Sequence, residues 1–94
     1  MIRNYRDEDT ERLAAGGNVR QWEAFRQQAE KRLRVLDAAA SLNDLATLNS
    51  NRLEALRGDR KGQYSIRING QWRICFEWAK DESGPSNVEI VDYH

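Results

Sequence analysis

The chain has few of the residues that stabilise small proteins covalently or through metals. Its 94 residues contain one cysteine, Cys75, and one histidine, His94. A single cysteine cannot form a disulfide within the chain, and no Cys, His and Asp cluster has the spacing of metal ligands. We therefore expect a reduced, cytoplasmic protein that is stabilised by its core and uses neither a metal nor a cofactor.

Long apolar runs are also absent. No stretch approaches the roughly 18 apolar residues that a membrane-spanning helix needs, and the chain does not open on a signal-peptide pattern. It has no glycine-rich phosphate loop and no nucleophile-elbow motif. Hydrophobic residues make up 39% of the chain, which is enough for one modest core. We expect a single domain over residues 1–94 with no membrane partner.

Net charge is absent overall, because 15 basic residues balance 15 acidic ones. The balance is uneven along the chain, since residues 52–73 hold six cations and two acids. Such a region attracts polyanions, although a solvated surface whose charges happen to cluster explains the same pattern. The candidate phosphate contacts of this segment are Arg57, Arg60, Lys61 and Arg67.

The first half of the chain has a helical pattern. Residues 2–5 suit a short first strand, and acidic residues 7–9 suit a helix start, where the helix dipole favours negative charge. Gly16-Gly17 ends this helix. A second helix is predicted over Val19–Ala40, because apolar residues recur there at spacings of three and four. Its stripe consists of Trp22, Phe25, Ala29, Leu33, Leu36 and Ala40. Leucines at 42, 45 and 48 suggest a turn or a further short helical piece, and residues 49–51 a loop.

The second half alternates apolar and polar residues and predicts a hairpin around Asn69-Gly70. A two-residue loop would put the apolar rows of the two strands on opposite faces. A three-residue loop over 69–71 instead sets Ile68 opposite Trp72 and Ile66 opposite Ile74, which leaves one apolar face for the helices to cover. We therefore predict an α+β fold, with two helices packed on one face of a small antiparallel sheet.

The same register places Arg67 directly opposite Arg73, on the face away from the long helix. Like charges in these positions repel unless something compensates them. Glu77 or Glu89 can do so, and a bound phosphate can do so equally well. Arg73 and Arg57 can stabilise negative charge on a reacting phosphate, or each can be an exposed cation in a weak surface pair.

A last strand over residues 87–91 leads to the end of the chain. His94 titrates near neutral pH and can therefore transfer a proton. Tyr93 can stack on a base or close the edge of the core. Asp92 can orient His94 or cap an amide, and Glu54 can act as a base. For a terminal histidine or a surface glutamate, having no role is the ordinary alternative.

Four segments together resemble the HigB branch of the RelE/ParE toxin superfamily, close to its GraT/HigB members. The resemblance covers essentially the whole chain. Its motifs are residues 53–60 (LEALRGDR), 62–67 (GQYSIR), 72–76 (WRICF) and the terminal 91–94 (VDYH). It implies a RelE-like fold and the toxin half of a type II toxin–antitoxin pair. The implied activity is ribosome-dependent cleavage of messenger RNA, without a metal, by attack of the RNA's own 2′-hydroxyl.

Roles and partners follow from the resemblance position by position. Arg73 would stabilise the phosphorane, Arg57 would contact the RNA backbone, and Asp92, Tyr93 and His94 would form a terminal catalytic group. The implied partners are a HigA-type helix-turn-helix antitoxin, messenger RNA, and the 70S ribosome at the A site of its small subunit. Operator DNA would be bound only through the antitoxin.

The sequence departs from the family pattern in two ways. Glu54 stands where some relatives carry a histidine, so either Glu54 assumes the role of the base or the activity is weaker. The neutral net charge contrasts with clearly basic relatives and implies weaker non-specific RNA binding. Two other functions remain open: a non-nucleolytic ParE-like toxin or binding module acting on a target such as DNA gyrase, and a ribonuclease that acts without the ribosome.

Overall fold

The computed structural model describes residues 1–92, which form a four-stranded antiparallel sheet with its helices at one face and one edge. The strand order is β1-β2-β3-β4, the same as the order in the sequence. The strands are β1 (Glu54–Ala55), β2 (Gln63–Arg67), β3 (Trp72–Glu77) and β4 (Ser86–Asp92). The helices are α1 (Glu8–Ala14), α2 (Arg26–Ala38) and α3 (Leu42–Ala46), with 3₁₀ helices η1 (Arg20–Phe25), η2 (Asn49–Asn51) and η3 (Gly58–Arg60). The predicted α+β class is confirmed.

Helix α1 begins and ends at the predicted signals. The Asp7 carboxylate accepts a hydrogen bond from the Thr10 backbone N–H at 3.2 Å, which caps the helix and adds negative charge at its N-terminus. Gly16 follows the helix with a φ of +91°, and its N–H donates to the Leu13 carbonyl. Glycine takes this left-handed conformation without steric cost, so it ends the helix there.

The predicted second helix is divided into two. Residues 20–25 form the 3₁₀ helix η1, and α2 begins only at Arg26. A 3₁₀ helix repeats every three residues, so Trp22 and Phe25 lie on the same side. Both rings contact Trp72 of β3, with centroid distances of 6.4 Å and 5.1 Å. This aromatic contact explains why the segment winds more tightly than the spacing alone indicates.

The predicted apolar stripe is correct except at its end. Trp22, Phe25, Ala29, Leu33 and Leu36 are all buried. Helix α2 ends at Ala38, and the extended backbone that follows buries Ala39 and exposes Ala40. The assignment of Ala40 to the core was therefore wrong, because the helical spacing does not continue past residue 38.

The hairpin between β2 and β3 has the predicted register. Ile66 lies opposite Ile74 and Arg67 opposite Arg73, and the Ile68 N–H donates to the Trp72 carbonyl. The Asn69 side chain accepts hydrogen bonds from the backbone N–H groups of Gln71 and Trp72, at 2.8 and 2.9 Å. The loop thus comprises residues 69–71, and the apolar rows of both strands share the face under α2.

The N-terminal segment forms less of a strand than we predicted. Tyr5 makes a single parallel bridge to Val88, flanked by backbone hydrogen bonds from Arg6 to Val88 and from Val88 to Asn4. Asn87 has a φ of +51°, a conformation that does not belong to a regular strand. Regular pairing between the N-terminal segment and β4 is therefore interrupted at Asn87, directly before the bridge at Val88.

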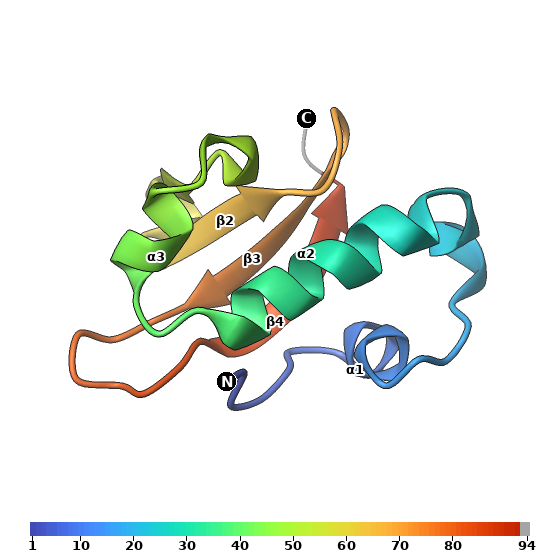
Figure 1. Ribbon diagram of the computed structural model, residues 1–94, viewed down its shortest axis with the longest axis horizontal. Coiled ribbons are helices and arrows are strands. Elements are labelled where there is room, and N and C mark those ends of the chain that lie inside the picture. The colour runs from blue at the N-terminus through green and yellow to red at the C-terminus, as the bar shows by residue number, and fades with distance from the viewer. Residues whose placement is uncertain (93–94) are drawn as a thin grey trace.

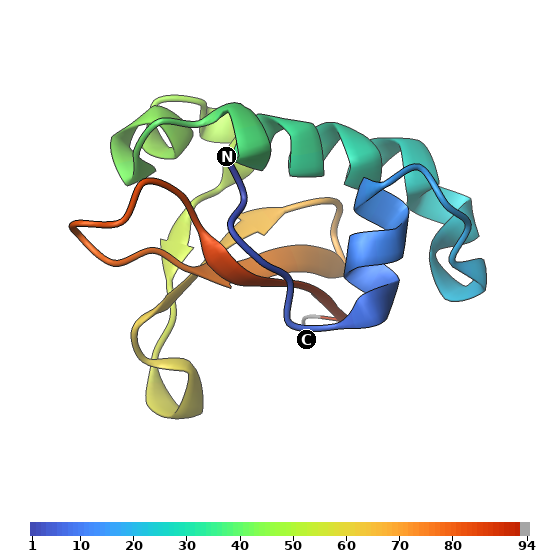
Figure 2. The ribbon, with the colours of Figure 1, turned by 90° about the horizontal axis from the view of Figure 1, so that it is seen from below.

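The elements lie in two layers (Figures 1 and 2). Helix α2 crosses one face of the sheet, and α1 packs beside β4, where the Thr10 hydroxyl accepts a hydrogen bond from the Ile90 N–H at 3.1 Å. The loop that contains η3 projects from the sheet on the side away from α2 (Figure 2). The polar side of the sheet is therefore left without a helix over it in the described part of the chain. Among residues 1–92, no helix is long and apolar enough to cross a bilayer.

Candidate functional site

Arg73 is held on the polar face of the sheet by hydrogen bonds on two sides. Its Nε donates to the Ser65 hydroxyl at 2.7 Å, and its Nη2 donates to the Arg52 carbonyl at 2.5 Å. Ser65 is fully buried, so the hydroxyl that receives Nε is itself fixed. A guanidinium anchored in this way can present positive charge without losing further side-chain entropy on binding.

Three predicted site residues line one depression on this face. Glu54 of β1, Arg67 of β2 and Arg73 of β3 meet there, together with Arg52, and the depression has a volume of about 550 Å³. The register explains the meeting, because Glu54 is opposite Ser65 and Arg73 is opposite Arg67. Ser65 and Arg67 are two residues apart on β2, so all four side chains belong to the same face of the sheet. We call this the Arg73 depression. Three guanidinium groups and one carboxylate make it suited to a phosphate with a proton acceptor beside it.

A second depression adjoins the first at Glu54. It has a volume of about 400 Å³, and Arg57 and Arg60 line it. Arg57 is exposed at the start of η3. Lys61 is exposed at the end of η3 but is not among the residues that line this depression. The predicted basic segment thus divides into two neighbouring sites that share one glutamate.

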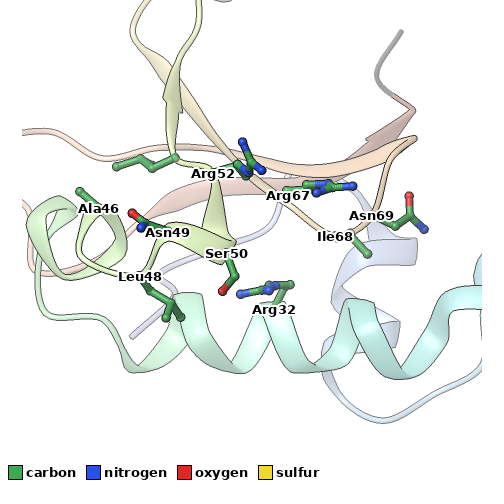
Figure 3. Close-up of a pocket in the computed structure, with 10 residues that line it drawn as sticks. Arg32, Ala46, Leu48, Asn49, Ser50, Arg52, Arg67, Ile68 and Asn69 are labelled. Carbon is green, nitrogen blue, oxygen red and sulfur yellow. The ribbon is translucent and has the colours of Figure 1, made fainter.

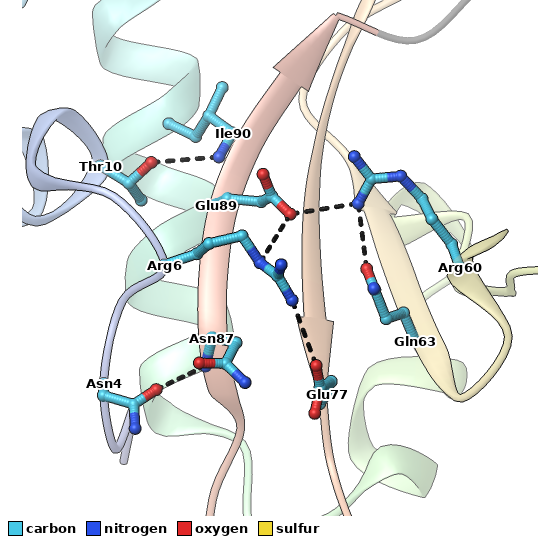
Figure 4. A network of polar contacts seen from close by, with 9 residues as sticks. All are labelled: Asn4, Arg6, Thr10, Arg60, Gln63, Glu77, Asn87, Glu89 and Ile90. Carbon is cyan, nitrogen blue, oxygen red and sulfur yellow. Dashed lines mark hydrogen bonds and ion pairs between the residues drawn. The ribbon is translucent and has the colours of Figure 1, made fainter.

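Arg60 belongs to an ion-pair network that crosses the sheet (Figure 4). Its Nη1 donates to Glu89 at 3.1 Å and to Gln63 at 3.0 Å. The same Glu89 oxygen receives Arg6 at 3.0 Å, and Arg6 also reaches Glu77 at 3.2 Å. The hydrogen bond that Arg60 donates to Glu89 raises the pKa of Arg60. The two glutamates that we considered as compensation for Arg67 and Arg73 therefore bind Arg6 and Arg60.

Cys75 lies beneath this network. It is 1% exposed and sits between Ser65 and Glu89 in the strand register. Burial raises the pKa of its thiol, Glu89 raises it further, and the arginines at 60, 73 and 6 oppose the effect. The thiol is therefore protonated near neutral pH, and we assign it to packing under the site.

Asp92 lies on the opposite side of the sheet from Arg73. It is directly opposite Trp72 at the end of β4, whereas Arg73 is opposite Val91. Since successive side chains of a strand point to opposite faces, Asp92 shares the face of Trp72. Its carboxylate accepts a hydrogen bond from Gln71 Nε2 at 3.1 Å. The structure thus does not bring Asp92 into the Arg73 depression. Tyr93 and His94 lie outside the described residues.

Two contributors to the site were not identified from the sequence. Ser65 appeared only as an alternating polar residue, and Arg52 only as one cation of a charged segment. Arg52 follows η2 with a φ of +49°, which turns its carbonyl toward Arg73. No sequence signal marks a non-glycine residue in this conformation. Among the described residues, no group of three or more His, Cys, Asp or Glu side chains is placed to hold a metal ion.

A family model matches the whole chain, residues 1–94, and describes a RelE-like toxin of the type II toxin–antitoxin system HigB. The chain belongs to the HigB-like toxin family. The predicted family and the RelE-like fold are thereby confirmed.

Two curated relatives of the HigB-like chain carry matching names. Toxin HigB-1 of Vibrio cholerae serotype O1 is 46% identical over 49 residues, which are 52% of this chain and 52% of that protein. Endoribonuclease HigB of Proteus vulgaris is 35% identical over 63 residues, 67% of this chain and 65% of that protein. The matched parts of this HigB-like chain therefore span about half of the first relative and less than two thirds of the second.

Proposed function

We propose that this chain is a ribosome-dependent messenger-RNA endoribonuclease and the toxin of a type II toxin–antitoxin pair. The observation that carries the proposal is the Arg73 depression, where an anchored guanidinium lies in one basin with Arg52, Arg67 and Glu54. A relative named as an endoribonuclease supports the reaction class. Cleavage would inhibit translation and growth.

The proposed chemistry needs no metal ion. The RNA's own 2′-hydroxyl attacks the adjacent phosphorus while a base takes its proton, and the 5′-oxygen leaves after it receives a proton. Arg73 neutralises the charge that develops on the non-bridging oxygens. Glu54 is our candidate for the base, and His94 is the candidate proton donor in a terminal group with Tyr93 and Asp92. Arg57, Arg60, Lys61 and Arg67 contact the RNA phosphates.

The proposed partners are the 70S ribosome with its message, and a HigA-type antitoxin. The antitoxin neutralises the toxin and carries the operator-DNA contact, and both act in the cytoplasm. Support comes from the family, whose description names a type II toxin–antitoxin system. The ribosome supplies an ordered message, which offsets the weak RNA attraction of a chain with no net charge.

The direct test is primer extension on one message with and without translating ribosomes. We expect cuts within codons at the ribosomal A site, and none on naked RNA at the same toxin concentration. Equal cutting of naked RNA would indicate a free ribonuclease. An intact message together with inhibited DNA gyrase would favour the ParE-like alternative. Chelator added to magnesium-balanced reactions should leave the cuts unchanged.

The assigned residues can be tested in the same assay. We expect Arg73→Ala to lower the cleavage rate by about 10²–10³-fold, the range measured for a lost charge-stabilising donor, and His94→Ala to lower it comparably. Arg12→Ala is the matched control, because Arg12 is exposed and pairs with Asp9 on α1, away from this face. Full activity of the Arg73 and His94 variants would overturn the assignment, and unchanged cleavage by Glu54→Gln would remove Glu54 as the base.

A further inference from the structure

A larger groove adjoins the Arg73 depression on the side of α2. Its volume is about 890 Å³, and it lies between α2, the segment that contains η2, and the end of β2. Figure 3 shows Arg32 rising from α2 on one side, with Arg52 and Arg67 across from it. None of the described residues that line the groove is acidic. We call it the Arg32 groove, and its charge is suited to an anion.

Arg32 is held in its position by a buried partner. Its Nη1 donates to the Asn51 side-chain oxygen at 2.7 Å, and Asn51 in turn donates to the Leu45 carbonyl at 3.0 Å. Asn51 is completely buried. A buried amide satisfied at both ends is a rigid support, so it fixes the guanidinium at the wall of the groove.

The groove also offers apolar surface. Leu48 is a large hydrophobic side chain that remains 47% exposed, and it lines the groove with Leu53 and Ile68. An exposed leucine beside several arginines matches a ligand that carries a phosphate on one side and a flat or sugar-like apolar surface on the other. A nucleotide has this composition, and the volume of the groove lies within the usual range for ligand sites.

Continuity with the proposed site identifies which nucleotide would bind. Arg52, Leu53 and Arg67 line both the Arg32 groove and the Arg73 depression. A strand whose reacting phosphate lies at Arg73 therefore passes directly into the groove. We propose that the Arg32 groove binds a flanking nucleotide of the RNA strand, with its phosphate at Arg32 and Arg52 and its base or sugar against Leu48. This inference rests on the proposed function and extends its substrate site beyond the reacting phosphate.

The test measures binding rather than cleavage. Fluorescently labelled 2′-O-methyl oligonucleotides, a trinucleotide and a heptanucleotide, are titrated with the full chain at low ionic strength. We expect the longer strand to bind more tightly because it reaches the groove. Arg32→Gln should weaken heptanucleotide binding about tenfold, as the loss of one charge-assisted contact predicts. It should also reduce the slope of log affinity against log salt by about 0.7 and leave trinucleotide binding unchanged.

Two further variants separate a contact from a general effect. Ser50→Glu places a negative charge in the groove without touching the Asn51 support and should act like Arg32→Gln. Arg34→Gln removes an exposed cation from the same helix, at a different cavity. It should lower the affinity for the trinucleotide and for the heptanucleotide only slightly, because the lost charge is distant from the groove. Thermal unfolding of each variant confirms that it folds.

The outcomes distinguish this inference from the function that it rests on. The groove would be overturned as a nucleotide site if Arg32→Gln and Arg34→Gln lowered heptanucleotide affinity equally. The same conclusion would follow if Arg32→Gln lowered the affinities for both oligonucleotides equally. A wild-type chain that binds both lengths equally, or neither, would also overturn it. Cleavage on ribosomes by the wild type would then still support the proposed function, whereas absence of cleavage with normal oligonucleotide binding would count against that function alone.

Discussion

Arg73 depends on groups that are distant from it in the sequence. Its guanidinium is held by Ser65 from the neighbouring strand and by the carbonyl of Arg52, which precedes β1. Cys75, two residues further along β3, is sealed beneath the arginines and Glu89 of the same face. Taken singly, Arg73, Ser65 and Cys75 are ordinary polar or apolar residues of a strand. Their specific neighbours are set by the register of the strands that pair beside them.

The raised pKa of Cys75 leads to a prediction for thiol chemistry. At about pH 8.5, where an unperturbed thiol is half ionised, the native chain should react with a disulfide reagent far more slowly than the chain in denaturant. Because the folded pKa lies above the unfolded value, the stability that this group contributes is present below the unfolded pKa and is lost as pH rises through the folded pKa. Equal rates for native and denatured protein would contradict this burial.

At the scale of elements, one glutamate of β4 joins the N-terminal segment and η3 to the sheet. Glu89 receives Arg6 and Arg60 on a single oxygen, and its side chain is 16% exposed. The network (Figure 4) ties Arg60 of η3 to the sheet. Arg57 lies at the start of the same short helix, and both arginines line the second depression. This arrangement couples the position of a candidate RNA contact to a structural ion pair.

Glu89→Gln should therefore destabilise the fold and loosen the η3 loop. Removing the charge leaves two guanidinium groups close together, but both partners are more than a third exposed, so screening limits the loss to about 1–2 kcal/mol. For a domain of this size that corresponds to a fall in Tm of roughly 4–16 °C. Glu30→Gln, which breaks only the i,i+4 pair with Arg26, should cost about 0.3–0.5 kcal/mol. Equal effects of the two changes would contradict the network.

At the scale of the whole molecule, one core connects every layer. Trp72 of β3 stacks on Phe25 at an interplanar angle of 27° and meets Trp22 edge-on at 68°. Phe76, Ile66 and Ile74 continue this core under α2. Whereas the core is shared by all layers, the charges are segregated. The cations of residues 52–73 lie on the polar face and edge of the sheet, and the excess of acidic residues lies elsewhere in the chain.

A single shared core predicts cooperative unfolding that depends on Trp72. We expect far-UV circular dichroism and tryptophan fluorescence to report the same guanidinium transition. Trp72→Ala should cost about 3 kcal/mol because it removes the ring between η1 and the sheet, while Trp72→Phe should retain most of the stability. Two separate transitions in the wild type, or a neutral Trp72→Ala, would show that η1 is not part of the core.

Much of the fold could be predicted because local chemistry specifies it. Asp7 and the glycines after residue 15 set the ends of α1, and the three-residue hairpin loop followed from the need for one apolar face. The tighter η1 helix and the single bridge at Tyr5 could not be predicted, because they depend on Trp72 and on the conformation of Asn87.

The candidate site divides in the same way. Alternation along two strands was enough to place Arg67 opposite Arg73, and a short-range pattern thus predicted the centre of the site. The side chain of Asp92 lies on the other face, and Ser65, Arg52 and Arg32 reach the site or its adjoining groove through contacts across the fold. The sequence by itself determined the family, the ends of α1 and the hairpin register, since each depends on neighbouring residues or on one repeating spacing. Only the tertiary structure decided which arginines are anchored and which depressions they share, because hydrogen bonds between distant segments are not encoded in any local pattern.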